Sequence, residues 1–307
     1  MRRGPVQHGI SLRCEQGFVI VAVLWLVAAL AALAMIFSAY LSNSARAVAL
    51  NDTALQAEAL VSAGVELTAY QLRLTGEDGR PARGSFQTRL NGAGLSVAFV
   101  SEAARIDLNA APKELLSGLM SVLGASTEDA AQFADRIVGW RTKAAAEASG
   151  REDALYLAAG RSYSPRQAPY AHVNELGLVL GLPAELVVRA LPFVTVFSRV
   201  SGVDVLNAAP EVVAALPGMT PLLLRQFLSD RGSLPNDPTA IATALGGAKG
   251  NAATQKSQAY RLKIRIHFPN GWESASQVVI SLGAEEEPYH VLSWQTDVAS
   301  RRAPARS

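Results

Sequence analysis

"GFVIVAVLWLVAALAALAMIFSAYL", residues 17–41, decides the fold of this chain, because a long apolar run follows directly on a polar start. No charged residue lies between Phe18 and Leu41. A helix rises about 1.5 Å per residue, so this run is long enough to cross a bilayer core of about 30 Å. The sequence therefore predicts a membrane span over residues 18–41.

Basic residues ahead of the span set its direction. Arg2, Arg3 and Arg13 precede it, and cytoplasmic flanks favour Lys and Arg, so we expect the N-terminus to stay inside and the rest to be exported. A cleaved secretory signal peptide is the alternative, and the alanines within 28–32 could imitate its cleavage site. Such a peptide has an apolar region of only about 7–15 residues, which favours the membrane span.

Charge and cysteine content narrow the class of protein. The formal net charge of the 307 residues is +2. Residues 1–17 hold three Arg and one Glu and account for all of it, so the remainder is neutral. A segment with no net charge lacks the excess of Lys and Arg that is typical of nucleic-acid-binding proteins. Cys14 is the only cysteine, which excludes an intrachain disulfide and a thiolate metal cluster.

Beyond the span, the pattern predicts an α+β fold in which a sheet is interrupted by helices. The N-terminal helix continues to residue 75, and strands follow at 85–91 and 94–102, with a hairpin turn at Gly92. Three more strands are predicted at 260–268, 273–283 and 289–297. The resulting divisions are 1–17 N-terminal segment, 18–75 helix, 76–102 first part of the sheet, 103–247 helical insertion, 248–299 second part of the sheet and 300–307 basic tail, which we expect to be disordered.

The helical insertion contains a repeat, LNAAP, at residues 108–112 and 206–210. Pro112 and Pro210 should each open a helix, because proline loses no hydrogen bond at a first helical position. Asn109 and Asn207 should bond to backbone in the turns before these helices, a structural and not a binding role. The segments look like helix-hairpin-helix units, so a membrane-anchored DNA-binding protein is the alternative function. The absence of a Gly-apolar-Gly nest and of net positive charge weighs against it.

Taken together, these features resemble the minor pseudopilin K family of type II secretion, also called general secretion pathway protein K. The resemblance rests on the order of the Gly17-Phe18 junction, the long helix, the LNAAP segments, the 174–176 stretch NEL, "LPFVTVFS" and "YHVLSWQT". It implies a pilin-like fold, with the long helix packed on a small antiparallel sheet and a large helical insertion. It also implies that residues 1–17 are a cytoplasmic leader peptide, which a prepilin peptidase removes by cleavage between Gly17 and Phe18, with N-methylation of Phe18.

One departure from general pilins concerns Ala22. Pilin-like proteins usually carry Glu at this fifth mature position, where it is thought to meet the terminal amine of the subunit ahead. Members of the K family are known for lacking it, which suggests a subunit with nobody ahead. The resemblance thus implies a protein of the inner membrane with a periplasmic domain, which initiates and caps a pseudopilus. Its implied partners are minor pseudopilins I and J, the major pseudopilin, prepilin peptidase, the inner-membrane platform and secreted cargo.

Enzymatic and metal chemistry find little support in the sequence. The histidines at 8, 172, 267 and 290 are scattered, and no HExxH, GxSxG or P-loop pattern occurs. We predict that the protein is no enzyme and requires no cofactor. Calcium remains a possibility by family resemblance, and the acidic trio at 285–287 invites it. Three adjacent residues do not all face one ion easily, so a solvated loop is favoured.

Overall fold

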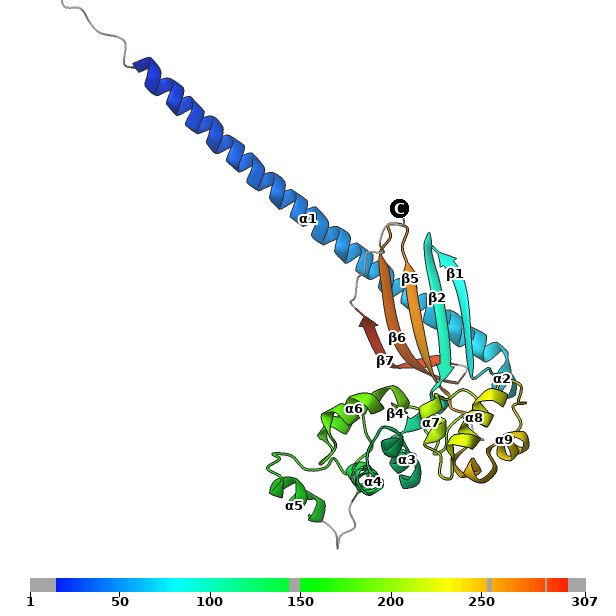
Figure 1. The fold of residues 1–307 in the computed structure, drawn as a ribbon. Helices are drawn as coiled ribbons and strands as arrows, with labels where there is room; N and C mark the ends of the chain where they lie inside the picture. Colours follow the sequence, from blue (N-terminus) through cyan, green and yellow to red (C-terminus); the bar gives the residue numbers. More distant parts are fainter. Residues whose placement is uncertain (1–14, 144–149, 253–255, 285, 298–307) are drawn as a thin grey trace, which may run out of the picture. The chain divides into compact units, whose positions relative to one another are not determined.

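The computed structural model describes residues 15–143, 150–252, 256–284 and 286–297. The chain divides into two compact units, residues 1–59 and residues 60–307. Their boundary falls inside the first helix, α1 (Glu15–Leu74), shown in Figure 1. The described part of the first unit is the N-terminal portion of α1. The second unit holds the remainder of α1, the sheet and the helical insertion.

Helix α1 differs slightly from its predicted bounds. It begins at Glu15, three residues ahead of the expected start at Phe18, and it ends at Leu74. Glu and Gln are good helix formers, and a glycine inside a helix costs only about 1 kcal/mol relative to alanine. Gly17 therefore does not stop the helix. A short helix, α2 (Gly76–Gly79), occupies the start of the 76–102 segment, ahead of its first strand.

The main sheet has five strands in the order β1-β2-β5-β6-β7, and every neighbouring pair is antiparallel. Its strands are β1 (Arg83–Leu90), β2 (Ala93–Ser101), β5 (Ala259–His267), β6 (Glu273–Leu282) and β7 (Tyr289–Asp297). Asn91 and Gly92 join β1 to β2 with φ of 50° and 81°. Two successive positive φ angles are what a two-residue hairpin turn requires, so the predicted hairpin is confirmed.

Strands from the two sides of the insertion meet in the middle of the sheet. Leu95 of β2 lies opposite Ile266 of β5, and the pairing runs from Gly94 to Ser101. The last strand, β7, is an edge strand whose register shifts opposite Val279 and Ile280, which leaves Leu292 as an extra, unpaired residue. Such a bulge twists an edge and makes it a poorer template for pairing with another chain.

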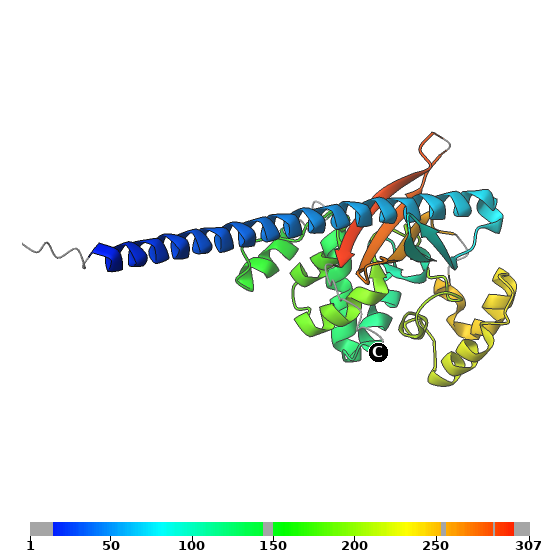
Figure 2. The same ribbon diagram turned by 90° about the horizontal axis from the view of Figure 1, so that it is seen from above.

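The C-terminal turns of α1 pack on one face of this sheet (Figure 2). The buried residues of this contact are Leu60, Val61, Val65 and Leu72 on the helix and Leu95, Val97, Leu262 and Ile264 on the strands. Gly64 marks the closest approach, since a Cβ atom there would lie 3.3 Å from Val97 Cγ2. The prediction that the outer half of the helix lies against a domain is therefore confirmed for residues 60–74.

The insertion is mostly helical, as predicted, with a core of its own that includes Leu115, Leu119, Val212 and Phe227. Its longer helices are α3 (Lys113–Val122), α4 (Thr127–Arg141), α5 (Arg151–Ala158), α6 (Ala184–Ala190), α7 (Pro210–Ala214), α8 (Pro221–Asp230) and α9 (Pro238–Leu245). The 3-10 segments among the insertion's described residues are η1 (Glu102–Ala104), η3 (Val173–Leu178), η4 (Leu191–Phe193) and η5 (Gly246–Asn251). Two strands of two residues each, β3 (Ile106–Asp107) and β4 (Val194–Thr195), pair in parallel.

Candidate processing and assembly sites

The N-terminal part of α1 is the candidate membrane anchor. Val19–Ser42 has a mean hydropathy of 2.9 and a length of 24 residues, and no part of it is covered by the rest of the described structure. At about 1.5 Å per residue it spans a bilayer core of about 30 Å. This helix fits a single-pass anchor with a C-terminal domain beyond it. Ala22 lies on it with an exposed side chain.

The predicted processing site lies at the start of α1. Gly17 and Phe18 are both helical in the uncleaved chain, and the side chain of Phe18 lies outside the described residues. Residues 1–14, which make up most of the predicted leader, also lie outside them. Cleavage after Gly17 and methylation of Phe18 therefore stay predictions.

The first LNAAP segment is held by side chains that reach far along the chain. Asp107 accepts a hydrogen bond from the backbone N–H of Asn109 at 2.7 Å and another from that of Arg199 at 2.7 Å. The Asn109 amide donates to the carbonyl of Tyr170 at 3.0 Å and accepts from the N–H of Tyr170 at 2.7 Å. We had expected Asn109 to bond to the preceding turn. It binds backbone 61 residues away instead, because Asp107 already caps that turn.

The second LNAAP segment is built differently. Asn207 Nδ2 donates to the Asp204 carboxylate at 2.8 Å, and the same carboxylate accepts from the N–H of Leu206 at 3.2 Å. Asn207 thus stays within the preceding turn, as expected, but its partner is a side chain and not the backbone. Pro112 is the N-cap residue of α3, and Pro210 is the first residue of α7. Both prolines therefore lie where the helices begin.

An arginine in each repeat binds the carbonyls of the LNAAP segment, which sequence reasoning missed. Arg141, the last residue of α4, donates to the carbonyls of Leu108 and Ala111. Arg231, the residue after α8, donates to the carbonyl of Ala208 at 2.8 Å. Burial lowers the pKa of the Arg141 guanidinium from its ordinary value. The available signal was positional, since both arginines lie at the C-terminal end of the second helix of their repeat.

Glu175, in the stretch at 174–176, has a structural role. Its carboxylate accepts hydrogen bonds from the N–H groups of Ala171 and His172, at 2.9 and 3.2 Å. It also pairs with Arg166 at 2.9 Å and accepts from the Trp140 indole at 3.1 Å. One carboxylate therefore joins η3, the segment before it and α4. The arrangement fixes the insertion and does not present a reactive group.

A buried ion pair joins the insertion to the sheet. Arg261 of β5 donates to both carboxylate oxygens of Glu102, at 2.6 and 3.0 Å, and the Glu102 side chain is completely buried. The Thr195 hydroxyl of β4 also donates to this carboxylate. Arg105 lies 3.9 Å from it and donates to the carbonyl of Pro192. Side chains from β4, from β5 and from the residue after η1 therefore converge on a single carboxylate at the point where the chain leaves the sheet.

The face of α1 that points away from the sheet carries an exposed apolar row. Leu67, Tyr70 and Leu74 are 37%, 63% and 66% exposed, and their spacing of three and four residues places them on one side of the helix. We call these three residues the helix row. Glu66 and Arg73 flank it, seven residues apart and therefore two turns along the same side. Coiled-coil helices recognise one another with apolar rows of this spacing and flanking charges.

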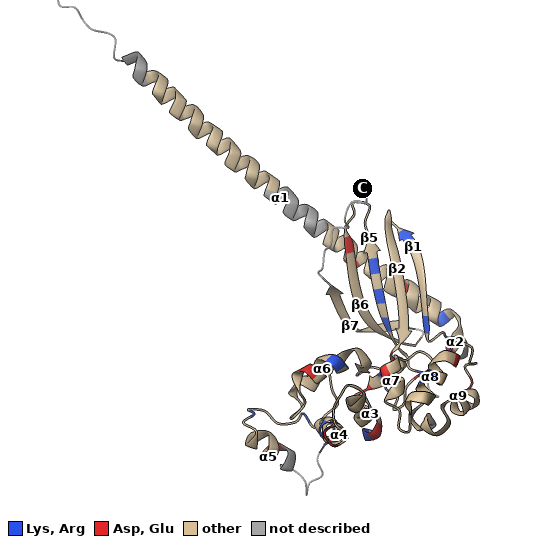
Figure 3. Ribbon diagram, in the orientation of Figure 1, with Lys and Arg blue, Asp and Glu red and all other residues tan. Residues whose placement is uncertain are grey.

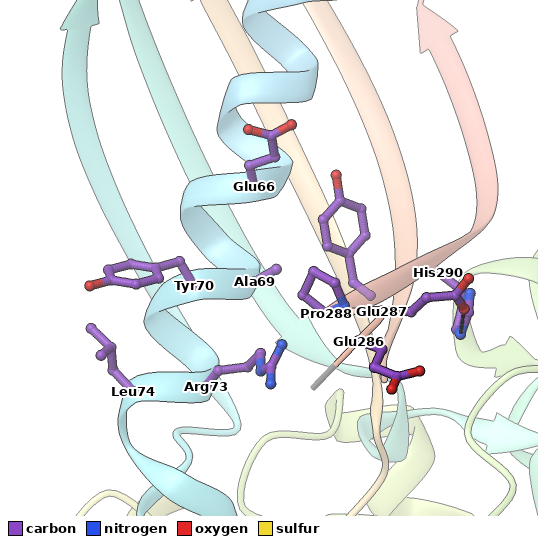
Figure 4. A pocket seen from close by; sticks show the side chains of 10 residues that line it. Glu66, Ala69, Tyr70, Arg73, Leu74, Glu286, Glu287, Pro288 and His290 are labelled. Carbon is purple, nitrogen blue, oxygen red and sulfur yellow. Dashed lines mark ion pairs between the residues drawn. The ribbon is translucent and has the colours of Figure 1, made fainter. Parts of the chain in front are cut away.

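Beside the helix row, α1 and the turn before β7 enclose a hollow of about 810 Å³ (Figure 4). Tyr70, Arg73 and Leu74 form its helix wall, and Pro288 and Tyr289 lie on the opposite wall. Burial raises the pKa of the Tyr289 phenol, and the neighbouring Glu66 carboxylate raises it further. The hollow is continuous with the helix row, since Tyr70 and Leu74 belong to both.

The histidines and the acidic trio form no metal site among the described residues, where no three His, Cys, Asp or Glu side chains are placed to hold an ion. His290 lies 3.3 Å from Glu287, and His267 lies 3.3 Å from Glu273. His172 accepts the N–H of Asn174 at 3.1 Å and so caps η3. Glu285 and His8 lie outside the described residues, and calcium binding stays a prediction.

The central segment of the chain is similar to a known protein family. Residues 89–199 match the model of the family described as type II secretion system (T2SS), protein K. No curated protein matches the chain. The resemblance drawn from the sequence is therefore confirmed by a family model that covers part of the chain, from the end of β1 to just past β4.

A solved structure shares the fold. The chain resembles one chain in the crystal structure of the GspK-GspI-GspJ complex from the enterotoxigenic Escherichia coli type 2 secretion system, with 20% sequence identity and a TM-score of 0.59. The match covers 81% of this chain and 99% of the other. The predicted α+β fold, with its N-terminal helix, antiparallel sheet and further helices, is confirmed.

Proposed function

We propose that this chain is a minor pseudopilin of a type II secretion system, which initiates and caps a periplasmic pseudopilus during export of folded proteins across the outer membrane. The observation that carries the proposal is α1, which is a bare apolar span in its first part and packs on a sheet in residues 60–74. The protein K match over residues 89–199 and the fold shared with the complex from Escherichia coli support it. The proposed role is structural and involves no catalysis.

Ala22 supports a position at the tip. A carboxylate at this depth of the membrane would cost about 2.5–3.5 kcal/mol on insertion scales unless a cation neutralised it. In the proposed assembly, the terminal amine of the subunit ahead supplies that cation. A subunit with nobody ahead has no use for a glutamate, and alanine stands at this position.

The insertion supports the same position for a steric reason. It interrupts the sheet between β2 and β5 and carries a separate core, so it adds substantial bulk to a small pilin-like domain. In a regular helical shaft, such bulk would collide with neighbouring subunits. At the end of the shaft it has room.

The helix row is the proposed contact with partner pseudopilins. Partners resembling minor pseudopilins I and J would lay an apolar helix face against Leu67, Tyr70 and Leu74. The flanking Glu66 and Arg73 would favour a partner helix with charges of opposite sign at the matching positions. The major pseudopilin, the prepilin peptidase, the inner-membrane platform and the secreted cargo are the other proposed partners.

Cysteine crosslinking in secreting cells tests this contact. Cys14 lies in the predicted leader, so Tyr70→Cys would supply the only cysteine of the mature chain. The matched control is Val188→Cys on α6, because Val188 is 66% exposed and Tyr70 is 63% exposed. With cysteines placed on the helices of the minor pseudopilins, we expect crosslinks from position 70 and none from position 188. Equal crosslinking from both positions, or none from 70, would reject the helix row as the contact.

Ala22→Glu tests the tip position. The new carboxylate would have no terminal amine to meet, so we expect secretion to fall while pull-down of the partners through the exported domain is unchanged. Increased secretion, or crosslinking of this chain along the shaft, would show that the subunit stands behind another.

A further inference from the structure

The face of the sheet opposite α1 carries an unusual density of positive charge. Residues that pair directly across antiparallel strands share a face, so the register defines this outer face from β1 to β7. Its basic residues on β1 and β5 are Arg83, Arg89, Arg261, Lys263, Arg265 and His267. Figure 3 shows lysine and arginine positions along β5 and on β1.

Four of these six residues have an ordinary structural explanation. Arg261 pairs with the buried Glu102, and His267 pairs with Glu273. Arg83 and Arg89 lie on β1, an edge strand, where charged side chains protect a sheet from pairing with other chains. Lys263 and Arg265 are the two that remain to be explained.

Lys263 and Arg265 lie on β5, the central strand, which needs no edge protection. Both side chains are exposed, and neither forms an ion pair or hydrogen bond with another described residue. Like charges two residues apart on one strand repel each other, and their exposure brings the sheet no packing. An antiparallel sheet with one wet face takes polar side chains at such positions, and uncharged ones would serve it equally, so the two positive charges are available to a partner.

The neighbours of these two cations leave a hollow over the sheet. Across β2 and β6, they face the short or uncharged side chains of Ser96, Ala98, Ala275 and Gln277. A hollow of about 460 Å³ is lined by Lys263, Arg265, Ala275, Gln277, Gln295, Ile264, Ser276 and Thr296. In the register of the sheet, Asp297 of β7 lies opposite Ala275. Two cations on one wall and two amides across from them make a site for carboxylates.

We propose that this hollow, which we call the β5 cleft, docks an extended acidic segment of a partner protein. Side chains two residues apart on a strand point the same way and are separated by about 6.8 Å. Lys263 and Arg265 have this spacing, so they match carboxylates at alternate positions of an extended segment. Gln277 and Gln295 add amide groups that can bind the partner's backbone. The β5 cleft lies on the face opposite the helix row, so it is a second surface and does not depend on the proposed pseudopilus contact.

Peptide binding to the full-length chain in a non-ionic detergent tests the proposal. The probe is a fluorescent five-residue peptide in which serine and glutamate alternate, with two glutamates. Its isomer with adjacent glutamates serves as the comparison, because adjacent carboxylates of an extended peptide point to opposite sides. At low ionic strength, where screening is weak, we expect the alternating peptide to bind roughly ten times more tightly than the isomer.

Variants locate the binding. Lys263→Gln combined with Arg265→Gln should weaken binding of the alternating peptide at least about tenfold, since two charge pairs are lost. Arg225→Gln, which removes an exposed arginine from α8, is the matched control and should leave affinity unchanged. All three replaced side chains are exposed, so thermal melts of the variants should follow the wild type.

Four results would overturn the proposal. Equal affinity for the two isomers, or an equal loss of binding in Arg225→Gln, would indicate general charge attraction. Competition by inorganic phosphate as strong as by the peptide itself would indicate a simple anion site. Displacement of the peptide by phosphatidylglycerol added to the micelles would assign the face to lipid.

Discussion

Asn109→Ala should destabilise the C-terminal domain more than Asn207→Ala, although both residues occupy the same place in a repeat. The Asn109 amide makes two hydrogen bonds, at 3.0 and 2.7 Å, with the carbonyl and the N–H of Tyr170. The Asn207 amide makes one, at 2.8 Å, with the Asp204 carboxylate. A hydrogen bond contributes about 0.5–1.5 kcal/mol net, and an orphaned buried partner costs about 1–3 kcal/mol. We therefore expect a loss of about 2–3 kcal/mol for Asn109→Ala and about 1 kcal/mol for Asn207→Ala.

Thermal and urea melts of a fragment comprising residues 47–307 would measure this difference. In a domain of this size, 1 kcal/mol shifts the melting temperature by about 2–4 °C, so Asn109→Ala should melt several degrees below Asn207→Ala. Asn109→Asp keeps an acceptor for the Tyr170 N–H and loses the donor to its carbonyl, so it should fall between wild type and Asn109→Ala. Equal shifts for the two alanine variants would refute the reasoning, as would a larger shift for Asn207→Ala.

Three further changes test separate parts of the structure. Gly118→Ala places a Cβ 2.0 Å from the backbone oxygen of Ala215, just past α7, so thermal melts should show a loss of stability of about 1–3 kcal/mol or more. Gly177→Ala is the control, because its Cβ would have no atom within 4 Å, and it should cost far less. Glu102→Ala leaves the charge of Arg261 without its partner and should cost about 3–5 kcal/mol of stability. The double variant Glu102→Leu with Arg261→Met should be much more stable than Glu102→Ala, because no buried charge remains unpaired. A double variant as unstable as Glu102→Ala would contradict the charge explanation. Gly17→Asp should leave the uncleaved precursor in the membrane, and mass spectrometry should find wild type beginning at methylated Phe18; a start after the alanine-rich segment would reveal a signal peptide instead.

The regular elements could be predicted because their signals are local. Alternation of Leu262 and Ile264 with charged residues has the period of a strand with one wet face, and the structure buries those two residues in β5. Asn91 and Gly92 suit a two-residue turn because both tolerate positive φ. The apolar run after Gly17 is long and uninterrupted, so its helical form needed no knowledge of the rest of the chain.

The contacts that hold the insertion could not be predicted, because they join positions far apart in sequence. Asn109 and Tyr170 are separated by 61 residues, and Glu102 and Arg261 by 159. Neither residue of a pair carries a local sign of its partner. β3 and β4 have only two residues each, which is too short for any periodicity to appear. The alternation of Lys263 and Arg265 with apolar residues can be read from the sequence, but the central position of their strand in the sheet cannot.

The way the insertion interrupts the sheet makes the two parts depend on each other. Pairing of Ser101 with Tyr260 closes a loop of residues 102–259, which for a flexible chain costs about 4–5 kcal/mol before constant terms. A folded insertion reduces this cost, because its own contacts already bring the two ends together. The N–H of Asp204 donates to the carbonyl of Ala103 at 2.7 Å, and the Ser257 hydroxyl donates to the carbonyl of Ser198 at 3.0 Å. The insertion therefore supports the pairing of β2 with β5, and the sheet that packs against α1 relies on the helical part for its central strand pair.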